Sequence, residues 1–334
     1  MILRRVKLQN FRSHEAYVLD FEPEITQILG ENGWGKTSVL EAIYITLRGK
    51  SFRATDKDIL RRGSEFYRIE TEFNDGARVV AVFLGSEGKT FLVEDKKVRR
   101  LPKKNRYPVV LFLPDDLRLV GTSPTKKRDY FDKVLNQFST GFSTALSRYN
   151  KALKQRNELL KQDFCDSNSL FSWDVMLAKY GVEIRDFRKK LVLEINERLT
   201  EVYRSIAQVD DEVELIYEPY IGDVDESGYL KLLALDYDRD RLTGHTNFGI
   251  HKDDFEFLFN GVDASVTASR GETRSVVIAL KFIEADLLYE KIGVRPIILL
   301  DDVFSELDET RQKALIKNFK DNQVVLTSVG ESSS

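Results

Sequence analysis

A glycine-rich loop near the N-terminal end carries the clearest chemical signal in the sequence. Its residues follow the pattern G-x-x-x-x-G-K-[ST] and are, in order, Gly30, Glu31, Asn32, Gly33, Trp34, Gly35, Lys36 and Thr37, with Ser38 next in the chain. The loop follows an apolar run and opens a helical pattern, the context in which backbone N–H groups and a helix N-terminus surround phosphate oxygens. Lys36 would reach the β- and γ-phosphates of ATP, and the Thr37 hydroxyl would bind Mg²⁺. A chance glycine turn before a surface helix is the weaker alternative.

Two carboxylates, Asp301 and Asp302, follow an apolar run at residues 296–300. A buried parallel strand that presents acid at its carboxyl end has this pattern. Asp301 would hold Mg²⁺ through water, and Asp302 could polarise an attacking water molecule. Taken alone, the pair is better explained as a core strand that ends in a solvated turn, but the phosphate loop makes the magnesium interpretation the stronger one. We therefore predict Lys36 and Asp302 as catalytic residues and Thr37 and Asp301 as metal ligands.

A third group of residues, Ser269, Gly271 and Glu272, opens a long helical pattern upstream of the acidic strand. Ser269 and Glu272 match a capping box, in which each side chain accepts a hydrogen bond from the other residue's backbone N–H. An ordinary helix cap is therefore one explanation. Anion binding is the other, because the same geometry presents free N–H groups and a positive helix dipole. Only the position of this group relative to the other two motifs favours the second explanation.

A run of seven basic residues without a single acid lies between residues 96 and 106. Its bases are Lys96, Lys97, Arg99, Arg100, Lys103, Lys104 and Arg106. A solvated hairpin and a phosphate-contact patch for DNA explain the run about equally well. Secondary candidates are Arg61 with Arg62, Lys126 with Lys127 and Arg128, and the group Arg185, Arg188, Lys189 and Lys190, which could equally cover a helix face. Aromatic residues do not alternate with these bases, so contact with a duplex backbone is favoured over stacking with a single strand.

The elements that must position these residues change character along the chain. Up to about residue 112, β-rich stretches predict strands at 2–8, 25–29, 68–73, 78–84, 90–94 and 108–112, interrupted by one helix from 36 to about 47. Residues 126–208 contain no proline and predict two long amphipathic helices, broken near 163–169. Strands return from about 212, followed by helix 272–290, strand 295–300, helix 308–319 and strand 324–327. This order predicts a discontinuous head formed by residues 1–122 and 209–334, and a helical lobe at 123–208.

The composition excludes several classes of protein. The chain has 334 residues, of which 42% are hydrophobic and 31% charged, which is typical of folded globular proteins and not of disordered ones. No apolar run approaches the ~18 residues of a membrane helix, and charges interrupt the N-terminal stretch, so we expect no signal peptide. The single cysteine, Cys165, excludes an internal disulfide, and three scattered histidines argue against zinc. We expect a cytoplasmic protein, and with a net charge of −3 it would bind DNA through a local patch.

The order of the three motifs resembles that of ABC-type ATPases. In those proteins, the signature serine and glycine of one protomer bind the γ-phosphate held by the phosphate loop of the other. The resemblance implies an α/β fold, with an ABC-type P-loop ATPase head that has a mixed sheet and an inserted helical lobe. It also implies that Ser269, Gly271 and Glu272 act in trans and that ATP drives the formation of a homodimer.

Further segments resemble the RecF family, bacterial gap-repair ATPases of the SMC-like branch. The segments are 8–13, 35–44, 49–53, 113–117, 121–132 and 251–254, and as an ordered set they span nearly the whole chain. The resemblance implies that Arg12 contributes to ATP binding. It further implies a weak, DNA-stimulated ATPase that binds duplex DNA near single-stranded gaps and assists RecA loading with RecR and RecO, without a membrane partner.

The sequence departs from the family pattern at a few positions. Glu272 stands where RecF proteins commonly have glutamine, Ile250 replaces a proline, Thr327 occupies the place of the transporter switch histidine, and no glutamine can be assigned to the Q-loop. Asp302 is one methylene shorter than the glutamate common at that position, which predicts slow turnover. Three alternatives stay open: the nucleotide-binding subunit of a membrane transporter, another SMC-like repair ATPase, and a small-molecule kinase that uses the same loop without dimerising.

Overall fold

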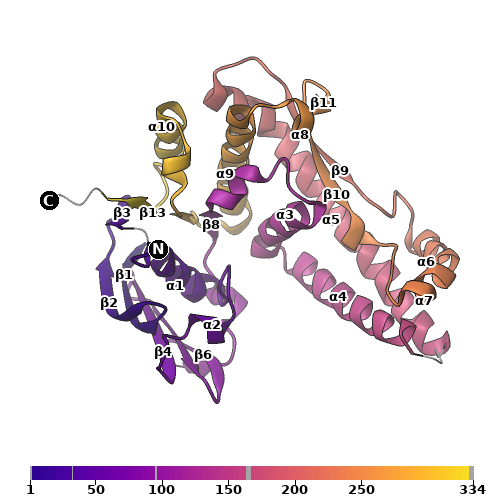
Figure 1. The fold of residues 1–334 in the computed structure, drawn as a ribbon, viewed down its shortest axis with the longest axis horizontal. Coiled ribbons are helices and arrows are strands. Elements are labelled where there is room, and N and C mark those ends of the chain that lie inside the picture. Colours follow the sequence, from indigo (N-terminus) through magenta and orange to yellow (C-terminus); the bar gives the residue numbers. More distant parts are fainter. Residues whose placement is uncertain (1, 32, 95, 163–166, 331–334) are drawn as a thin grey trace. The chain divides into compact units, whose positions relative to one another are not determined.

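The computed structural model describes residues 2–31, 33–94, 96–162 and 167–330 (Figure 1). Two residues named above, Asn32 and Cys165, lie outside these ranges. Contacts along the backbone divide the chain into two compact units. The head unit consists of Met1–Asp116 with Glu284–Ser334, and the helical unit consists of Leu117–Ile283.

Six antiparallel strands form one sheet of the head unit, in the order β2-β1-β4-β5-β6-β7. The strands are β1 (Leu3–Phe11), β2 (His14–Asp20), β4 (Phe66–Phe73), β5 (Arg78–Leu84), β6 (Gly88–Val93) and β7 (Lys96–Val98). Along β1, Leu3, Val6 and Leu8 are buried and polar residues separate them, as expected of a sheet with one face on the core. A register shift between Leu3 and Arg5 allows both Leu3 and Val6 to face inward.

Four parallel strands form the second sheet of the head unit, in the order β3-β13-β12-β8. They are β3 (Ile25–Gly30), β8 (Val109–Phe112), β12 (Ile297–Leu300) and β13 (Val324–Val329). The last strand in sequence, β13, therefore lies between β3 and β12. The carboxyl ends of β3 and β12, where the phosphate loop and the two aspartates begin, point to the same edge of the sheet.

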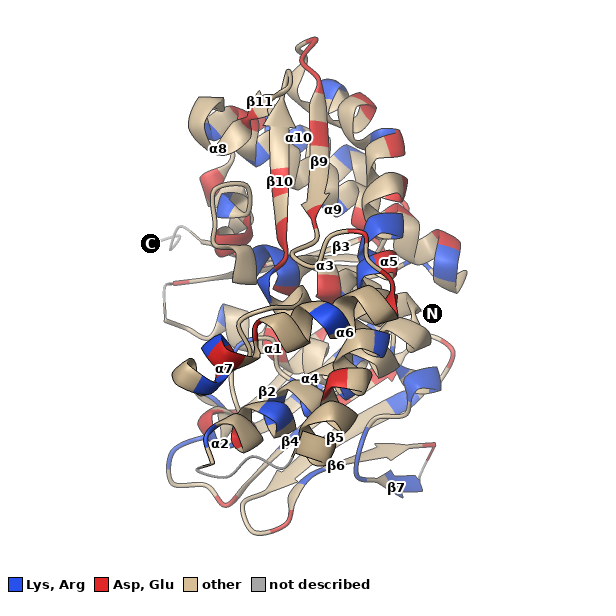
Figure 2. Cartoon of the chain, turned by 90° about the vertical axis from the view of Figure 1, so that its right-hand side faces the viewer, with Lys and Arg blue, Asp and Glu red and all other residues tan. Residues whose placement is uncertain are grey.

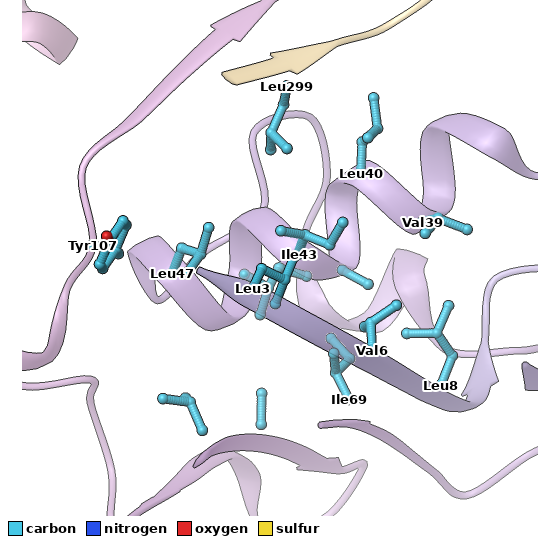
Figure 3. Close-up of a cluster of buried hydrophobic side chains, with 14 of the residues drawn as sticks. Leu3, Val6, Leu8, Val39, Leu40, Ile43, Leu47, Ile69, Tyr107 and Leu299 are labelled. Atoms are coloured by element: carbon cyan, nitrogen blue, oxygen red, sulfur yellow. The ribbon is translucent and has the colours of Figure 1, made fainter. Parts of the chain in front are cut away.

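Helix α1 (Lys36–Arg48) packs between the two sheets of the head unit. Its apolar residues Val39, Leu40, Ile43 and Leu47 recur at helical spacing and are buried. Figure 3 shows side chains of β1 on one side of this helix and Leu299 of β12 on the other. Because each buried leucine or isoleucine contributes ~1.5–3 kcal/mol, this core fixes the start of α1 relative to both sheets. The remaining elements of this unit are the helices α2 (Asp56–Ile59) and α10 (Glu309–Asn318) and the 3₁₀ turns Lys103–Asn105 and Val303–Glu306.

The helical unit combines long helices with a small antiparallel sheet. Its helices are α3 (Pro124–Phe138), α4 (Thr140–Leu160), α5 (Ser167–Ala207), α6 (Glu226–Leu235), α7 (Tyr237–Thr243) and α8 (Ala264–Thr267). Helices α4 and α5 run side by side (Figure 1). The sheet has the order β11-β10-β9, with β9 (Val213–Glu218), β10 (Asp254–Phe259) and β11 (Val262–Asp263). Helix α9 (Arg270–Ile292) begins in this unit.

Most of the predicted elements are confirmed to within a few residues, but the prediction of two helices between 126 and 208 is wrong. Three helices are present, because α3 ends and α4 begins around Ser139. Ser139 is extended, with a φ of −103° and a ψ of 110°, and its side chain accepts a hydrogen bond from the Phe142 N–H. The helix break therefore comes from an N-cap serine, a signal that the absence of proline obscured. Strands β2 and β7 and helices α6 and α7 were not predicted.

The two units differ from the predicted domains at residues 209–283. The prediction placed these residues in the head, whereas the structure groups them with the helical unit. The reason is packing, since β9 lies against α5 and β10 lies against α3. None of the described helices is both long enough and apolar enough to cross a membrane.

Candidate nucleotide-binding site

The phosphate loop joins β3 to α1 and is shaped by two glycines with positive φ angles. Gly33 has a φ of 88° and Gly35 a φ of 102°, conformations that residues with a side chain rarely adopt. A Cβ atom on Gly35 would also lie 2.6 Å from His14 Nε2 and 2.7 Å from Ser13 Oγ. Only glycine therefore allows the turn that brings the N-terminus of α1, with its unpaired N–H groups, to the end of β3.

Lys36 is buried in this loop, and backbone carbonyls hold its ammonium group. Nζ donates to Gly30 O at 2.6 Å and contacts Glu31 O at 3.3 Å. A cavity of about 460 Å³ opens beside the loop, within the ~300–1,000 Å³ range of small-molecule sites. Its lining includes Arg12, Glu31, Gly33, Gly35, Lys36, Thr37, Ser38, Arg53 and Asp302. Seven of the predicted ATP-binding residues thus line one hollow of suitable size, whereas Gly30 and Trp34 are not among its lining residues.

Thr37 and Asp301 meet at the carboxyl edge of the parallel sheet. Asp301 Oδ1 accepts hydrogen bonds from Thr37 Oγ1 at 2.9 Å and from Thr327 Oγ1 at 3.0 Å. Burial raises the pKa of Asp301, although both hydroxyls oppose the rise. Among the described residues no cation forms an ion pair with this carboxylate. A hydroxyl and a carboxylate are hard oxygen ligands of the kind that Mg²⁺ binds together with phosphates and water, so these residues fit the predicted metal ion.

Asp302 adopts a left-handed backbone conformation next to Asp301, with a φ of 49°. Its N–H donates to Thr327 Oγ1 at 2.8 Å, which ties the residue to the neighbouring strand β13. Within the described ranges, its Oδ1 atom is buried and has no hydrogen-bond partner. A carboxylate oxygen of this kind, on a strained residue that lines the cavity, is suited to orient a water molecule.

A carboxylate that sequence reasoning missed, Glu41 of α1, organises one wall of the cavity. It is fully buried, accepts two hydrogen bonds of 2.9 Å from Arg12, and pairs with Arg53 at 3.0 Å. Burial raises the pKa of Glu41, but hydrogen bonds from Arg12, Ser51 and Arg53 outweigh this effect, and the net pKa is lowered. Glu41 therefore holds two cations, Arg12 and Arg53, at the cavity. In the sequence, the signal that could have identified Glu41 was a single carboxylate among the apolar residues of the buried face of a helix.

Trp34 packs against the phosphate loop and against β2. Its ring forms edge-on contacts with His14 and Tyr17, at centroid distances of 5.4 Å and 5.3 Å. A Cβ atom on Gly30 would lie 3.4 Å from the Trp34 ring, so the indole also covers the start of the loop. The aromatic cluster supports the shape of the loop, and a direct contact of Trp34 with ATP stays a prediction.

The capping box predicted at the start of α9 is confirmed. The Ser269 N–H donates to Glu272 Oε2 at 2.6 Å, and the Glu272 N–H donates to Ser269 Oγ at 3.3 Å. Ser269 is exposed, and Gly271 lies in the first turn of the helix. Both residues belong to the helical unit, so their binding to a phosphate held by another copy stays a prediction.

The basic run from Lys96 to Arg106 is exposed at every one of its bases. Figure 2 shows these bases along β7 and the segment that follows it. Within the described ranges, Lys97 lies 3.9 Å from Glu87, and the other six bases have no carboxylate partner. The run is thus free to meet an anionic partner.

Three residues of the secondary basic candidates are corrected by the structure. Arg188 is 2% exposed and pairs with Asp132 at 2.9 Å and with Asp253 at 2.7 Å. Arg185 is buried as well, and Lys127 is buried against Asp254 at 3.5 Å. The partners of these cations belong to the same unit, so Arg185, Arg188 and Lys127 hold the helical unit together and do not form a surface patch.

Comparison with known proteins identifies similar sequences over nearly the whole chain. A family described as "AAA domain" matches residues 5–218. The protein of Halalkalibacterium halodurans named "DNA replication and repair protein RecF" is 36% identical and covers 95% of this chain and 89% of its own length. The protein of the same name from Alkaliphilus oremlandii is 34% identical and covers 98% and 93%.

Solved structures give the same result at the level of the fold. A structure of the recombination mediator protein RecF with ATP, in the RecFOR pathway, has a TM-score of 0.88 at 26% identity and covers 100% of this chain and 93% of its own. A second, with ATPrS, has a TM-score of 0.89 at 27% identity and covers 99% and 93%. An SMC head bound to a domain of ScpA has a TM-score of 0.56 at 14% identity, covers 99% and 90%, and is similar in fold alone.

Proposed function

The chain belongs to the RecF family of DNA replication and repair proteins, and on that basis we propose that it is an ATPase that binds DNA as an ATP-dependent homodimer. Its fold is that of ABC-type and SMC-head ATPases. In this proposal ATP joins two copies, the dimer binds duplex DNA near single-stranded gaps, and slow hydrolysis releases it.

One observation carries the ATPase part of the proposal. Thr37 of the phosphate loop and Asp301 at the end of β12 are 264 positions apart in sequence, yet they are joined by a hydrogen bond of 2.9 Å. The pairing brings a phosphate-binding loop, a hydroxyl and two carboxylates to one edge of the sheet, where Thr37 and Asp302 line the cavity. This is the set of groups that ATP hydrolysis requires.

The charged and hydroxyl residues at the cavity and beside it would have distinct tasks in hydrolysis. Lys36 would leave the loop carbonyls for the β- and γ-phosphates, while Arg12 and Arg53, fixed by Glu41, balance the negative charge. Bound at Thr37 and Asp301, Mg²⁺ would neutralise charge that develops on the phosphates. Asp302 would hold the attacking water through its free carboxylate oxygen. The short aspartate side chain reaches less far than a glutamate would, so we expect slow turnover.

Dimerisation would complete the cavity from the second copy. The exposed capping box at Ser269 offers helix N–H groups and a hydroxyl, which favour an anion. In the proposal Ser269, Gly271 and Glu272 of one copy contact the γ-phosphate held by the other. Hydrolysis then removes the group that both copies share, and the dimer separates.

The DNA-binding part of the proposal is supported by family membership and by the exposed basic run at 96–106. Bases without carboxylate partners bind phosphates by releasing counterions, independently of sequence. The RecFOR pathway of the similar structures supports RecR and RecO as partners, and RecA loading as the outcome. We place this activity in the cytoplasm.

Fluorescence anisotropy of a labelled gapped duplex tests the proposal. The titration is run with and without ATP–Mg²⁺, at two salt concentrations, with Lys36→Met as the control that keeps the fold but loses the phosphate contact. We expect ATP-dependent binding that salt weakens and that the variant lacks. Sedimentation of the same samples should show a dimer only with ATP–Mg²⁺.

The same titration separates the proposal from its alternatives. Absence of DNA binding in every state would overturn the DNA role, keep the ATPase, and favour a transporter subunit. Hydrolysis by a strict monomer, without any effect of Ser269 variants, would favour a small-molecule kinase. Binding of DNA without dependence on ATP would contradict the ATP-dependent dimer.

A further inference from the structure

A second cavity of about 650 Å³ lies in the head unit and shares no lining residue with the nucleotide cavity. It lies between the end of α1, strands β4 to β6, the segment 104–108 and the residues around 292–294. Leu47, Phe73, Val79 and Tyr107 are buried side chains of its wall, and Val294 is half-buried. Figure 3 shows Leu47 and Tyr107 next to each other at the end of α1. The cavity therefore has the size and the apolar wall of a ligand site.

The rim of this cavity is cationic. Its charged lining residues are four cations, Arg68, Arg78, Lys104 and Arg106, and one carboxylate, Glu94. Arg68 and Arg78 already pair with Glu70, at 3.1 Å and 2.5 Å. Within the part of the chain that the structure describes, neither Lys104 nor Arg106 pairs with a carboxylate. Lys104 and Arg106 thus carry positive charge that no ion pair among the described residues offsets, and with Glu94 counted the rim stays cationic.

A further cation, close to Arg106, adds to this positive charge. Arg48, the last residue of α1, donates to Tyr107 O at 3.1 Å. Burial lowers the pKa of Arg48, and the nearby charge of Arg106 lowers it further. An anion at the rim would relieve the repulsion between the two guanidinium groups.

We propose that this cavity docks an acidic peptide of a partner protein, with one apolar side chain of the peptide in the cavity and its carboxylates over Lys104 and Arg106. An apolar wall favours a leucine-like or aromatic side chain and disfavours a phosphate. The exposed bases Arg99, Arg100 and Lys103 precede Lys104 in the chain and belong to the run also proposed to contact DNA, so the peptide and DNA would share them. Several carboxylates in a row would use this whole surface, whereas a small molecule would use only the rim.

The proposal can be tested with labelled synthetic peptides and the full-length chain. The probe is a nine-residue fluorescein peptide with four aspartates followed by leucine and phenylalanine. One matched peptide has serines in place of the leucine and phenylalanine, and another has asparagines in place of the aspartates. We expect the first peptide to bind at least roughly ten-fold more tightly than the serine control, the factor expected for burial of one large apolar side chain. It should also bind more tightly than the asparagine control, which lacks the charges that would meet Lys104 and Arg106.

Variants of the protein distinguish the cavity from the basic surface. Ala77→Phe and Val294→Trp fill the cavity from two different segments, and Lys104→Glu reverses charge at the rim. Each should weaken peptide binding roughly ten-fold or more, while Lys320→Glu, an exposed cation elsewhere in the head unit, should not. Two cavity variants are used so that one poorly folded protein does not decide the result, and ATP binding serves as the measure of folding. Neither cavity variant should alter binding of gapped DNA.

Five results would overturn the proposal. The serine peptide could bind as tightly as the apolar one, which would show that charge alone causes the binding. All three peptides could fail to bind at concentrations up to about 1 mM. The variants with a filled cavity could bind the first peptide as tightly as the unaltered protein does. A small aromatic carboxylate such as 4-phenylbutyrate could match the peptide, which would indicate a metabolite site. Loss of DNA binding in the filled variants would assign the cavity to a nucleotide base.

Discussion

Asp301 and Asp302 are neighbours in sequence but have different surroundings. Asp301 is 6% exposed and accepts two hydroxyl hydrogen bonds, whereas Asp302 has a left-handed backbone and one carboxylate oxygen without a partner among the described residues. In the proposed mechanism the first would hold a cation with Thr37, and the second would orient water. Thr327 fixes both residues, because its hydroxyl accepts from the Asp302 N–H and donates to Asp301 Oδ1.

Replacing Asp302 with asparagine separates catalysis from binding. Asp302→Asn keeps the size of the side chain and the N–H bond to Thr327, but it weakens the acceptor for water. We expect the rate of ATP hydrolysis to fall roughly 100-fold or more, with ATP affinity little changed. Phosphate release in a single turnover measures the rate. Unchanged hydrolysis would remove Asp302 from the mechanism.

Replacing Glu41 with glutamine tests the support of Arg12 and Arg53. Glu41→Gln leaves two guanidinium groups without their shared carboxylate, so we expect a loss of about 1–3 kcal/mol in unfolding free energy and weaker ATP binding. The partial exposure of both arginines keeps the loss below that of a fully buried pair. Denaturation and nucleotide titration measure the two effects, with Glu72→Gln, a paired carboxylate on β4, as the control. Equal ATP affinity in both variants would contradict the role of Glu41.

At the scale of elements, α9 begins with a cap that stabilises the helix and that, in the proposed dimer, would also bind an anion. Ser269 and Glu272 satisfy each other's N–H groups, which stabilises the helix. The exposed position of Ser269 also leaves the helix N-terminus accessible to an anion. Substitutions of Ser269 can therefore alter the stability of the helix and the proposed contact with the γ-phosphate of the other copy independently.

Two substitutions of Ser269 separate these purposes. Ser269→Ala removes the cap and should lower stability by about 1 kcal/mol. Ser269→Asp keeps a good cap, so stability should be retained, but its charge would repel the γ-phosphate and prevent the ATP-dependent dimer. Thermal denaturation and sedimentation with ATP–Mg²⁺ measure the two properties. A normal dimer in Ser269→Asp would exclude the signature role.

Within the helical unit, His251 joins elements that are distant in sequence. Its Nδ1 atom lies 2.9 Å from the Tyr149 hydroxyl of α4, and its Nε2 atom lies 3.1 Å from Thr246 O. Burial lowers the pKa of His251 from 6.5 to about 4; the Thr246 carbonyl and Asp240 oppose this shift, and the charges of Lys252 and Arg128 reinforce it. The folded unit therefore contains the neutral imidazole.

This buried imidazole predicts a loss of stability in mild acid. The unfolded chain binds the proton more tightly than the folded one, so the stabilisation is complete above pH 6.5 and is lost as the pH falls toward 4. Between pH 7.5 and 5 the loss should be about 1–2 kcal/mol. In His251→Gln the loss between the same two pH values should be smaller by that amount, as measured by chemical denaturation. Identical pH profiles of the two proteins would contradict the assignment.

At the scale of the whole molecule, a local cluster of basic residues stands out in a chain whose net charge is weakly negative. The net charge is −3, so the overall field does not attract DNA, while the run at 96–106 carries seven exposed bases. Several other basic groups are buried in ion pairs, Arg188 among them. Binding to DNA would thus depend on one patch per copy, and a dimer would double it.

The dependence of DNA binding on salt should report this patch. For each phosphate that a variant no longer neutralises, the slope of log affinity against log salt concentration should decrease in magnitude by ~0.9. We expect this decrease for Arg99→Ala and for Arg100→Ala, at every DNA sequence alike, and no change for Lys320→Ala. Anisotropy at four salt concentrations gives the slopes. A constant slope in both arginine variants would locate the DNA-binding surface elsewhere.

The sequence by itself determined the local parts of the site. The glycines at 33 and 35, the start of α1 at Lys36, the apolar strand before Asp301 and the capping box at Ser269 all follow from residues a few positions apart. Such neighbours fix backbone angles, caps and the buried face of a helix without reference to the rest of the chain. For the same reason, Ser139 could have been identified as the break between α3 and α4.

Only the tertiary structure decided which distant residues meet. The insertion of β13 between β3 and β12 places Thr327 beside Asp301, and the burial of Glu41 gathers Arg12 and Arg53 at the cavity. Packing of β9 and β10 on α5 and α3 assigns residues 209–283 to the helical unit, and it buries Arg188, which in sequence resembles a surface base. The physical reason is that strand order and burial depend on contacts between segments far apart in the chain, and local residue patterns do not encode which segments will be neighbours.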